Sequence, residues 1–161
     1  MRVVQKNNYF LVALSFVLAL FLTIMPLPHM LVWLRPQWML MVLLFWVIVA
    51  PEECGVILAW SVGLVTDLVC GTPIGQQALI FVLLVYIVSK LHPIIAHSLR
   101  WQQAIIIGIF AGLAVFVQSI IFGFTGRNPH TLLNILSLFS TILMWPWVFA
   151  LLNQWRPRVY L

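Results

Sequence analysis

Charged residues occur at only a few points along this sequence, and the stretches that separate them are apolar. No charged residue occurs between Lys6 and Arg35, or between Arg100 and Arg127. Over all 161 residues, 64% are hydrophobic and 7% are charged, and the mean hydropathy is +1.13. A soluble domain carries about a quarter of its residues as Asp, Glu, Lys or Arg, and a globule this apolar would expose patches that aggregate. The sequence therefore excludes soluble enzymes and disordered chains, and it indicates a protein that folds in lipid.

The apolar stretches are long enough to cross a membrane several times. A transmembrane helix needs about 17–25 residues, and the breaks between the stretches contain proline, glycine or charged residues. The shortest stretch ends at Pro51, and a connection at 91–102 is expected to lie along the membrane surface. We predict a single domain, an all-α, compact six-helix transmembrane bundle, with spans at residues 9–25, 38–50, 54–70, 76–90, 103–125 and 131–153.

The basic residues indicate how the spans are oriented. The chain has 8 Lys and Arg residues and a net charge of +5. Because they are spread between the apolar stretches and not gathered on one face, we predict no nucleic-acid partner. With six spans, all of them except Arg35 and Arg127 fall on the side that holds both termini. Cytoplasmic loops carry the excess of Lys and Arg, so we predict that both termini are cytoplasmic.

Few side chains could carry out catalysis or bind a metal. The chain has 3 carboxylates, and two of them, Glu52 and Glu53, are neighbours at a turn. The 4 histidines all fall in expected connections, and no spacing of His, Cys and carboxylates resembles a metal site. A glycine motif that would bind phosphate is also missing. We therefore predict that the protein is not an enzyme and has neither a metal nor a cofactor.

Asp67 is an ionisable residue inside an expected span, one turn before Gly71. An ionisable group at the bilayer centre costs about 3 kcal/mol, and such a residue is by default a candidate for function. Three roles are open for it. It is a capping or bundle-stabilising carboxylate bonded to Thr66, Thr72 or a neighbouring helix, or a contact to a partner, or a proton or cation site.

Small and polar residues recur at helical spacing in the last two expected spans. The polar face of the last span is expected to hold helices together by hydrogen bonds or else to line a ligand pocket. It contains Asn134, Ser137 and Thr141, which Gln118 of the preceding span could join. The small residues of that preceding span would pack against a helix of the same chain or of a partner; they are Ala104, Gly108, Gly112, Ser119 and Gly123. A weaker stripe in the first span contains Ser15, Ala19 and Thr23.

Several motifs taken together resemble one protein family. They are Arg35-Pro36-Gln37-Trp38, the pattern Gly63-x-x-x-Asp67-Leu68-x-x-Gly71-x-x-x-Gly75, Trp101-Gln102-Gln103-Ala104 and Trp145-Pro146-Trp147. In their order and spacing, and over nearly the whole chain, they resemble the MreD family of bacterial rod shape-determining proteins. The turn with Glu52 and Glu53 departs from the family pattern, in which basic or neutral residues are expected there.

The resemblance implies a multi-pass protein of the bacterial inner membrane that belongs to the cell-wall elongation machinery, the elongasome. Its implied partner is MreC and, through MreC, the actin-like MreB and the glycosyltransferase and transpeptidase of peptidoglycan synthesis. The family is also similar in fold to the substrate-binding subunits of energy-coupling-factor vitamin transporters.

Our main hypothesis is a non-catalytic membrane scaffold that binds MreC and helps to maintain rod shape. The alternative is a membrane subunit of a transporter that binds a small ligand between Gln118 and the polar face of the last span. Such subunits dock their coupling partner through an Ala-x-x-x-Ala pair on the first span, whereas this chain has Ser15 and Ala19 at that spacing. Proton coupling through Asp67 is a third hypothesis.

Overall fold

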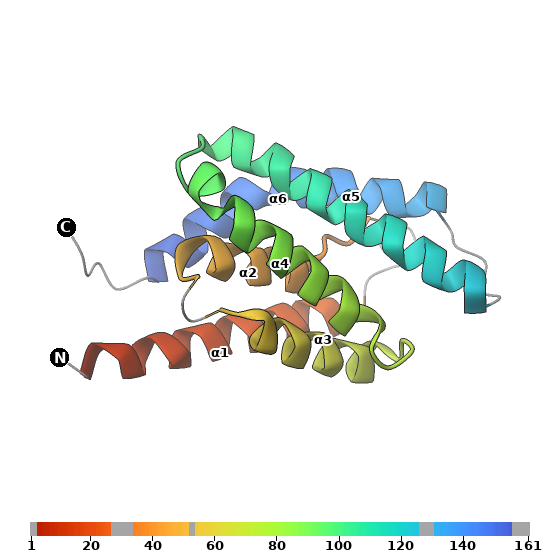
Figure 1. Ribbon diagram of the computed structural model, residues 1–161, viewed down its shortest axis with the longest axis horizontal. Helices are drawn as coiled ribbons and strands as arrows, with labels where there is room; N and C mark the ends of the chain where they lie inside the picture. Colours follow the sequence, from red (N-terminus) through yellow and green to blue (C-terminus); the bar gives the residue numbers. More distant parts are fainter. Residues whose placement is uncertain (1–2, 27–33, 52–53, 126–130, 156–161) are drawn as a thin grey trace.

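The part of the chain that the structure describes contains helices and no strands. The computed structural model describes residues 3–26, 34–51, 54–125 and 131–155. Six helices follow one another in these ranges (Figure 1): α1 (Val3–Ile24), α2 (Trp38–Val49), α3 (Val56–Cys70), α4 (Gln76–Ala96), α5 (Arg100–Thr125) and α6 (Thr131–Trp155). The prediction of an all-helical protein with six helices is therefore confirmed.

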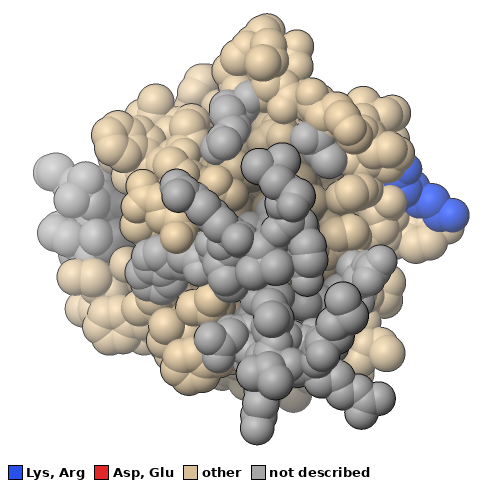
Figure 2. Space-filling model, turned by 90° about the vertical axis from the view of Figure 1, so that its left-hand side faces the viewer, with Lys and Arg blue, Asp and Glu red and all other residues tan. Residues whose placement is uncertain are grey.

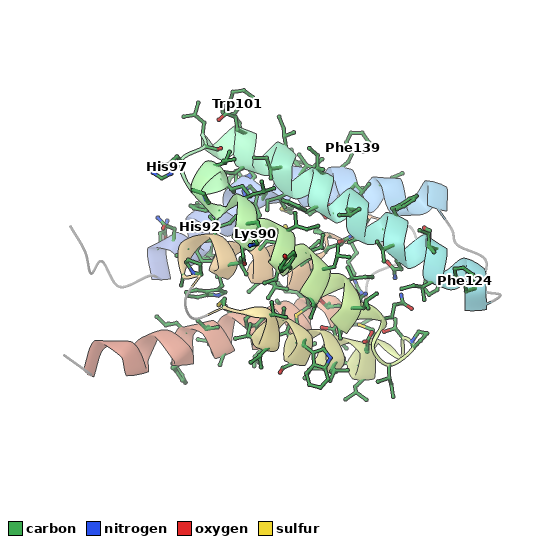
Figure 3. The ribbon with its side chains drawn as sticks, in the orientation of Figure 1. Lys90, His92, His97, Trp101, Phe124 and Phe139 are labelled. Atoms are coloured by element: carbon green, nitrogen blue, oxygen red, sulfur yellow. The ribbon has the colours of Figure 1, made fainter. Side chains whose placement is uncertain are left out.

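Successive helices run back and forth between the two ends of the molecule. The start of α1, the end of α6 and the link between α4 and α5 lie at the left in Figure 1, and we call this the terminal end. The turn between α3 and α4 lies at the opposite end, which we call the turn end. Lys90, His92 and His97 lie towards the terminal end (Figure 3). This arrangement is the one expected for a chain whose termini share one side of a membrane.

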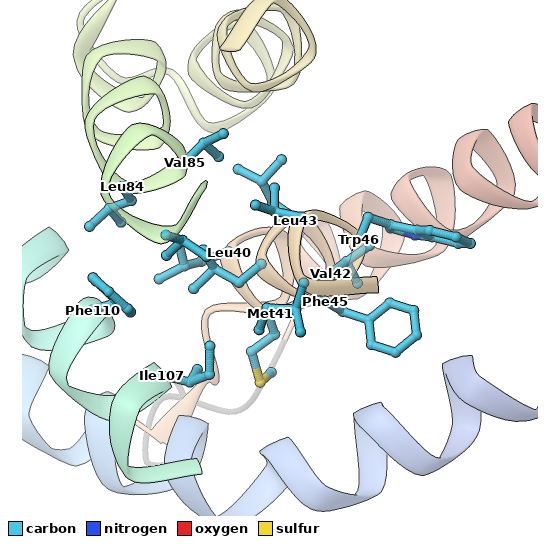
Figure 4. Close-up of a cluster of buried hydrophobic side chains, with 14 of the residues drawn as sticks. Leu40, Met41, Val42, Leu43, Phe45, Trp46, Leu84, Val85, Ile107 and Phe110 are labelled. Carbon is cyan, nitrogen blue, oxygen red and sulfur yellow. The ribbon is translucent and has the colours of Figure 1, made fainter. Parts of the chain in front are cut away.

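Helix α2 forms the centre of the bundle. Every residue from Met39 to Ile48 is buried, because α1, α4, α5 and α6 all contact this helix. Figure 4 shows Leu40 and Leu43 on the side of α2 that faces Leu84 and Val85 of α4, whereas Phe45 and Trp46 point the other way. A helix that is apolar on all sides is stable only where protein or lipid surrounds it. Since Met39 to Ile48 are buried within the chain, protein surrounds α2 instead of lipid. Its 12 residues span about 18 Å, which is less than the roughly 30 Å of a bilayer core.

The outer surface of the bundle is apolar as well. Phe124 of α5 is 90% exposed, and Phe139, Leu143 and Trp147 of α6 are each more than 70% exposed; Figure 3 shows Phe124 and Phe139 directed outwards. Figure 2 looks onto the terminal end, where Lys or Arg is visible only at the edge of the described surface. A surface of this kind aggregates in water but is suited to lipid chains.

Three of the described helices are long and apolar enough to cross a membrane by themselves. They contain the stretches Gln76–Ile95, Trp101–Phe124 and Leu136–Gln154, of 20, 24 and 19 residues. The apolar parts of the other three, Phe10–Ile24, Trp38–Val49 and Val56–Cys70, are shorter. Complete crossing by all six helices stays a prediction.

The prediction of a surface connection over residues 91–102 is wrong. Helix α4 continues through Pro93 to Ala96, and α5 begins at Arg100, so only a short link remains. Gln103 Nε2 donates hydrogen bonds to the carbonyl oxygens of Ile95 (3.0 Å) and Ser98 (3.3 Å). These bonds give partners to carbonyl groups at and just after the end of α4, which the helix itself leaves unpaired. The amide of Leu99 donates to Gln102 Oε1 (3.0 Å), half of a capping box that starts α5. The other helix bounds differ from the expected ones by a few residues, most of all in α1, which begins at Val3.

We expect Leu44→Ala to lower the free energy of unfolding by about 2–5 kcal/mol, the usual cost of removing a buried leucine side chain. Leu44 lies in α2 and is fully buried. The matched control is Leu143→Ala, because Leu143 of α6 is 74% exposed, and it should change stability by less than about 1 kcal/mol. Circular dichroism during unfolding of the detergent-solubilised protein by sodium dodecyl sulfate measures both. Equal losses in the two variants would contradict the central position of α2.

Candidate functional site

The carboxylate of Asp67 lies at the junction of α3 and α4 and is fully buried. Its Oδ1 accepts hydrogen bonds from Thr72 Oγ1 (2.6 Å) and from the Gln77 backbone N–H (3.0 Å). Its Oδ2 accepts from the backbone N–H groups of Gly75 (2.9 Å) and Gln77 (3.2 Å). A helix start leaves N–H groups without partners and carries a partial positive charge. Asp67 therefore caps α4 from the preceding helix.

Two glycines shape the turn that brings Asp67 to this position. Gly71 ends α3 with φ +64°, and Gly75 precedes α4 with φ +96°. Both values lie in the left-handed region, which glycine adopts without steric cost. The backbone carbonyl of Asp67 accepts from the N–H groups of Gly71 and of Thr72 (3.1 Å). Asp67 therefore ends α3 with its carbonyl and starts α4 with its side chain.

Gly63 allows the two helices to approach closely. A Cβ atom at this position would lie 2.3 Å from Ala78 Cα and 2.6 Å from Ala78 N. These are backbone atoms, which cannot move aside without shifting α4. The pattern Gly63, Asp67, Gly71, Gly75 is thus explained by one helix hairpin: a close crossing, a cap and two left-handed turn residues.

This geometry supports the capping interpretation of Asp67, with Thr72 as one of its partners. Thr66, the other expected partner, donates instead to the carbonyl of Val62 in its own helix (2.7 Å). In the part of the chain described, no group of three or more His, Cys, Asp or Glu residues could hold a metal ion. The partner-contact and proton roles of Asp67 stay predictions.

The polar face of α6 binds an irregular segment of backbone. Ser137 Oγ donates to the carbonyl of Arg35 (2.7 Å), and Thr141 Oγ1 accepts from the N–H of Gln37 (3.2 Å). Residues 35–37 are not helical, so these side chains supply partners that the backbone cannot find in a helix. Asn134 lies in α6, but its side chain is outside the described residues.

A cavity of about 290 Å³ lies in the bundle, where residues of the α3–α4 hairpin and Ser137 of α6 contribute to its lining. All six helices and the segment before α2 contribute to its lining, which joins polar side chains to an apolar wall. Sequence analysis had singled out Arg35, Trp38, Gln118 and Ser137, which all line it. It missed Gln77, because a glutamine in the first turn of a helix carries no distinguishing signal. The described lining residues are Thr23, Arg35, Pro36, Gln37, Trp38, Met39, Leu40, Thr66, Cys70, Gln77, Phe81, Ala114, Val115, Gln118 and Ser137.

The stripe of small residues on α5 is divided between two environments. Ala104 and Gly108 are buried, and a Cβ at Gly108 would lie 2.5 Å from Cγ1 of Ile142 in α6. This part therefore packs within the chain. Ser119 is half-buried and bonds to its own helix, whereas Gly123 is exposed and would have no atom within 4 Å of a Cβ. Among the residues that the structure describes, nothing covers the end of the stripe at Gly123, which leaves it as the candidate contact for a partner.

Aromatic side chains connect α6 to α1 through the central helix. Trp145, which is fully buried, packs edge-on against Phe149, and Phe149 packs in the same way against Phe45 of α2. Phe45 contacts Trp46, whose Nε1 donates to Ser15 Oγ of α1 (2.8 Å). The stripe at Ser15 and Ala19 is thus buried against the bundle, so it is not a free docking surface.

The remaining residues of the family motifs lie apart from the cavity. Trp147 is 75% exposed and Trp101 is 60% exposed, as suits aromatic side chains that meet lipid or its interface. Pro146 lies inside α6. These residues belong to the outer surface, so the motifs do not form one site.

Comparisons with known proteins identify relatives along nearly the whole chain. Residues 4–155 match the family model described as rod shape-determining protein MreD. A curated relative, the rod shape-determining protein MreD of Haemophilus influenzae, is 31% identical over 158 residues, which are 96% of this chain and 95% of the relative. No solved structure matches the chain, so the expected likeness to transporter subunits has no support from known structures.

We expect Gly63→Ala to lower the free energy of unfolding by about 1–3 kcal/mol, the usual cost of overpacking. The new methyl group would collide with the backbone of Ala78. Gly112→Ala is the matched control, because a Cβ there meets only Leu138 Cδ1 at 4.0 Å. It should be neutral or stabilise by up to about 1 kcal/mol, since alanine favours a helix. Thermal unfolding in detergent compares them, and a neutral Gly63→Ala would contradict the close crossing of α3 and α4.

Asp67→Asn should destabilise the protein by about 1–3 kcal/mol, because the amide nitrogen of asparagine cannot accept the hydrogen bonds that a carboxylate oxygen accepts. Thr66→Val serves as the control, since Thr66 bonds only within its own helix. In cells, rod shape should fail only as far as the amount of membrane-inserted protein falls. Round cells at an unchanged protein level would favour the proton or cation role instead.

Proposed function

Because the chain belongs to the MreD family of rod shape-determining proteins, we propose that it is a non-catalytic scaffold that binds MreC in the bacterial inner membrane. Family membership gives it a role in rod shape determination, and its apolar helices make it a multi-pass membrane protein. Through MreC the scaffold would connect to MreB and to the glycosyltransferase and transpeptidase of cell-wall synthesis.

The observation that carries this proposal is how the reactive side chains are used. Asp67 caps a helix, His92 Nε2 bonds to the carbonyl of Ile48 (2.9 Å), and His97 Nδ1 bonds to the carbonyl of Pro93 (2.8 Å). These three side chains therefore bond to backbone groups near helix ends. An acid or base that serves catalysis must instead reach a substrate, so this arrangement favours a structural role.

The distribution of basic residues supports an orientation with both termini in the cytoplasm. Lys6 lies near the start of α1, Lys90 near the end of α4, and Arg100 at the start of α5. All three positions are at or towards the terminal end (Figure 1). Since Lys and Arg gather on the cytoplasmic side, the turn end would face the periplasm.

The open end of the small-residue stripe is our candidate surface for the membrane helix of MreC. Small side chains let two helix backbones approach closely, which is a main source of adhesion in lipid. Gly108 already contacts Ile142 of the same chain, whereas a Cβ at Gly123 would have no described atom within 4 Å. A partner helix would therefore meet α5 near Ser119 and Gly123.

A second function, the ligand-binding subunit of a transporter, is favoured by the cavity beside Gln118 and Ser137. Its volume of about 290 Å³ is at the lower limit of small-molecule pockets. The burial of Ser15 and Ala19 removes the surface that such subunits would use for docking. A vitamin-sized molecule retained in native mass spectrometry of the purified protein would favour this function over the scaffold.

We expect Gly123→Leu to reduce recovery of the MreC homologue in a pull-down from detergent by about tenfold, because a bulky side chain would hold the two backbones apart. Gly55→Leu makes the same exchange at another exposed glycine with no atom within 4 Å of a Cβ. This control should recover MreC as the unaltered protein does. Both variants are then tested for restoring rod shape in cells depleted of their own MreD.

If MreC is not recovered even with the unaltered protein, the scaffold proposal fails. If it is recovered equally with both variants, the surface near Gly123 is not the contact.

A further inference from the structure

The cavity at the turn end is lined by one positively charged side chain, Arg35, that no described residue neutralises. Arg35 lines this cavity, and its guanidinium donates from Nη2 to the carbonyl of Met25. Its Nε atom is buried and has no hydrogen-bond partner. Arg35 forms no ion pair with any residue that the structure describes, and both oxygens of Asp67 are occupied by the turn. A guanidinium has five N–H donors, so most of the donors of Arg35 have no partner among the residues that the structure describes.

Two uncharged amides line the same cavity. Gln77 and Gln118 line the cavity, and their side chains form no hydrogen bond with a described residue. Gln77 lies in the first turn of α4 and Gln118 lies in α5. Each amide group carries two N–H donors. Side chains that can donate hydrogen bonds therefore line this cavity from three separate parts of the chain, and one of them is a cation.

An anion would satisfy this arrangement better than water or a neutral ligand. A partly buried charge without a counter-ion is costly, because the surrounding apolar groups do not solvate it. The lining also contains the apolar residues Leu40, Phe81 and Val115, which suit a hydrocarbon or sugar group attached to the anion. Arginine binds phosphate through two parallel hydrogen bonds.

We propose that this cavity binds a phosphate ester through Arg35, with Gln77 and Gln118 as additional donors. The volume of about 290 Å³ accommodates a phosphate with a glycerol-sized group. The phosphate belongs either to the headgroup of an anionic phospholipid or to a soluble phosphate ester. The site goes beyond scaffolding and is independent of MreC, because every residue that forms it is within this chain.

The experiment uses the purified full chain and measures the dissociation constant by microscale thermophoresis. One arm titrates short-chain phosphatidylglycerol, with short-chain phosphatidylcholine as its control, and the other titrates glycerol 3-phosphate, both into protein in a neutral detergent. Saturable binding in the first arm alone identifies a lipid headgroup, and saturable binding in both identifies a soluble ester as well. The absence of saturable binding in both arms overturns the proposal.

Three variants distinguish the cavity from general attraction to charge. Arg35→Gln should weaken binding by about tenfold or more, the effect of losing a charge-assisted hydrogen bond. Gln118→Glu keeps the size of the side chain but adds a negative charge to the lining of the cavity, so it should abolish binding of an anion even if Arg35→Gln fails to fold. Lys90→Gln removes an exposed positive charge at the far end of α4 and should bind as the unaltered protein does. Unchanged binding by a folded Gln118→Glu protein, or equal weakening by Lys90→Gln, overturns the assignment to the cavity.

Discussion

Backbone N–H and C=O groups that leave a helix inside a bilayer must find partners within the protein, because lipid offers none. This chain meets that constraint at two places near the turn end. Between α3 and α4, Asp67 accepts from the turn and from the start of the next helix. Before α2, Ser137 and Thr141 bind the backbone of Arg35 and Gln37. These polar side chains thus supply hydrogen bonds to the backbone where helices begin or end.

The short helix α2 begins directly after the second of these places, at Trp38. It is too short to cross a bilayer alone, so it is stable only where longer helices surround it. One of those helices, α6, also supplies hydrogen-bond partners for the backbone that precedes α2. Trp46 contacts Ser15 on one side, and Phe45 contacts Phe149 on the other. The cavity lies beside the start of α2, and residues of all six helices line it. A central helix that is shorter than its neighbours thus both organises the core and leaves room for a ligand.

Sequence patterns predicted local features better than contacts between distant segments. The helices lie close to the expected ranges because proline, glycine and charge interrupt the apolar stretches where helices end. The prediction of a connection over residues 91–102 was wrong, because Gln102 and Gln103 form hydrogen bonds with the backbone at the ends of α4 and α5. This capping role has no strong sequence pattern. Gly108 was expected to contact a helix of this chain or of a partner, and only its distance to Ile142 distinguishes these. The capping role of Asp67 was one of three that spacing alone left open.

Sequence by itself determined that this is an all-helical membrane protein of the MreD family with little reactive chemistry, because apolar length, charge spacing and motif order are properties of the linear chain. Only the tertiary structure decided that α2 is enclosed, that Asp67 caps a helix and that Arg35 shares a cavity with Gln77 and Gln118. The reason is physical: periodicity shows which face of a helix is apolar or polar, but a helix that is apolar all round has no distinctive face. Which side chains converge on one cavity depends on how the helices cross, and crossing is set by contacts such as that between Gly63 and Ala78.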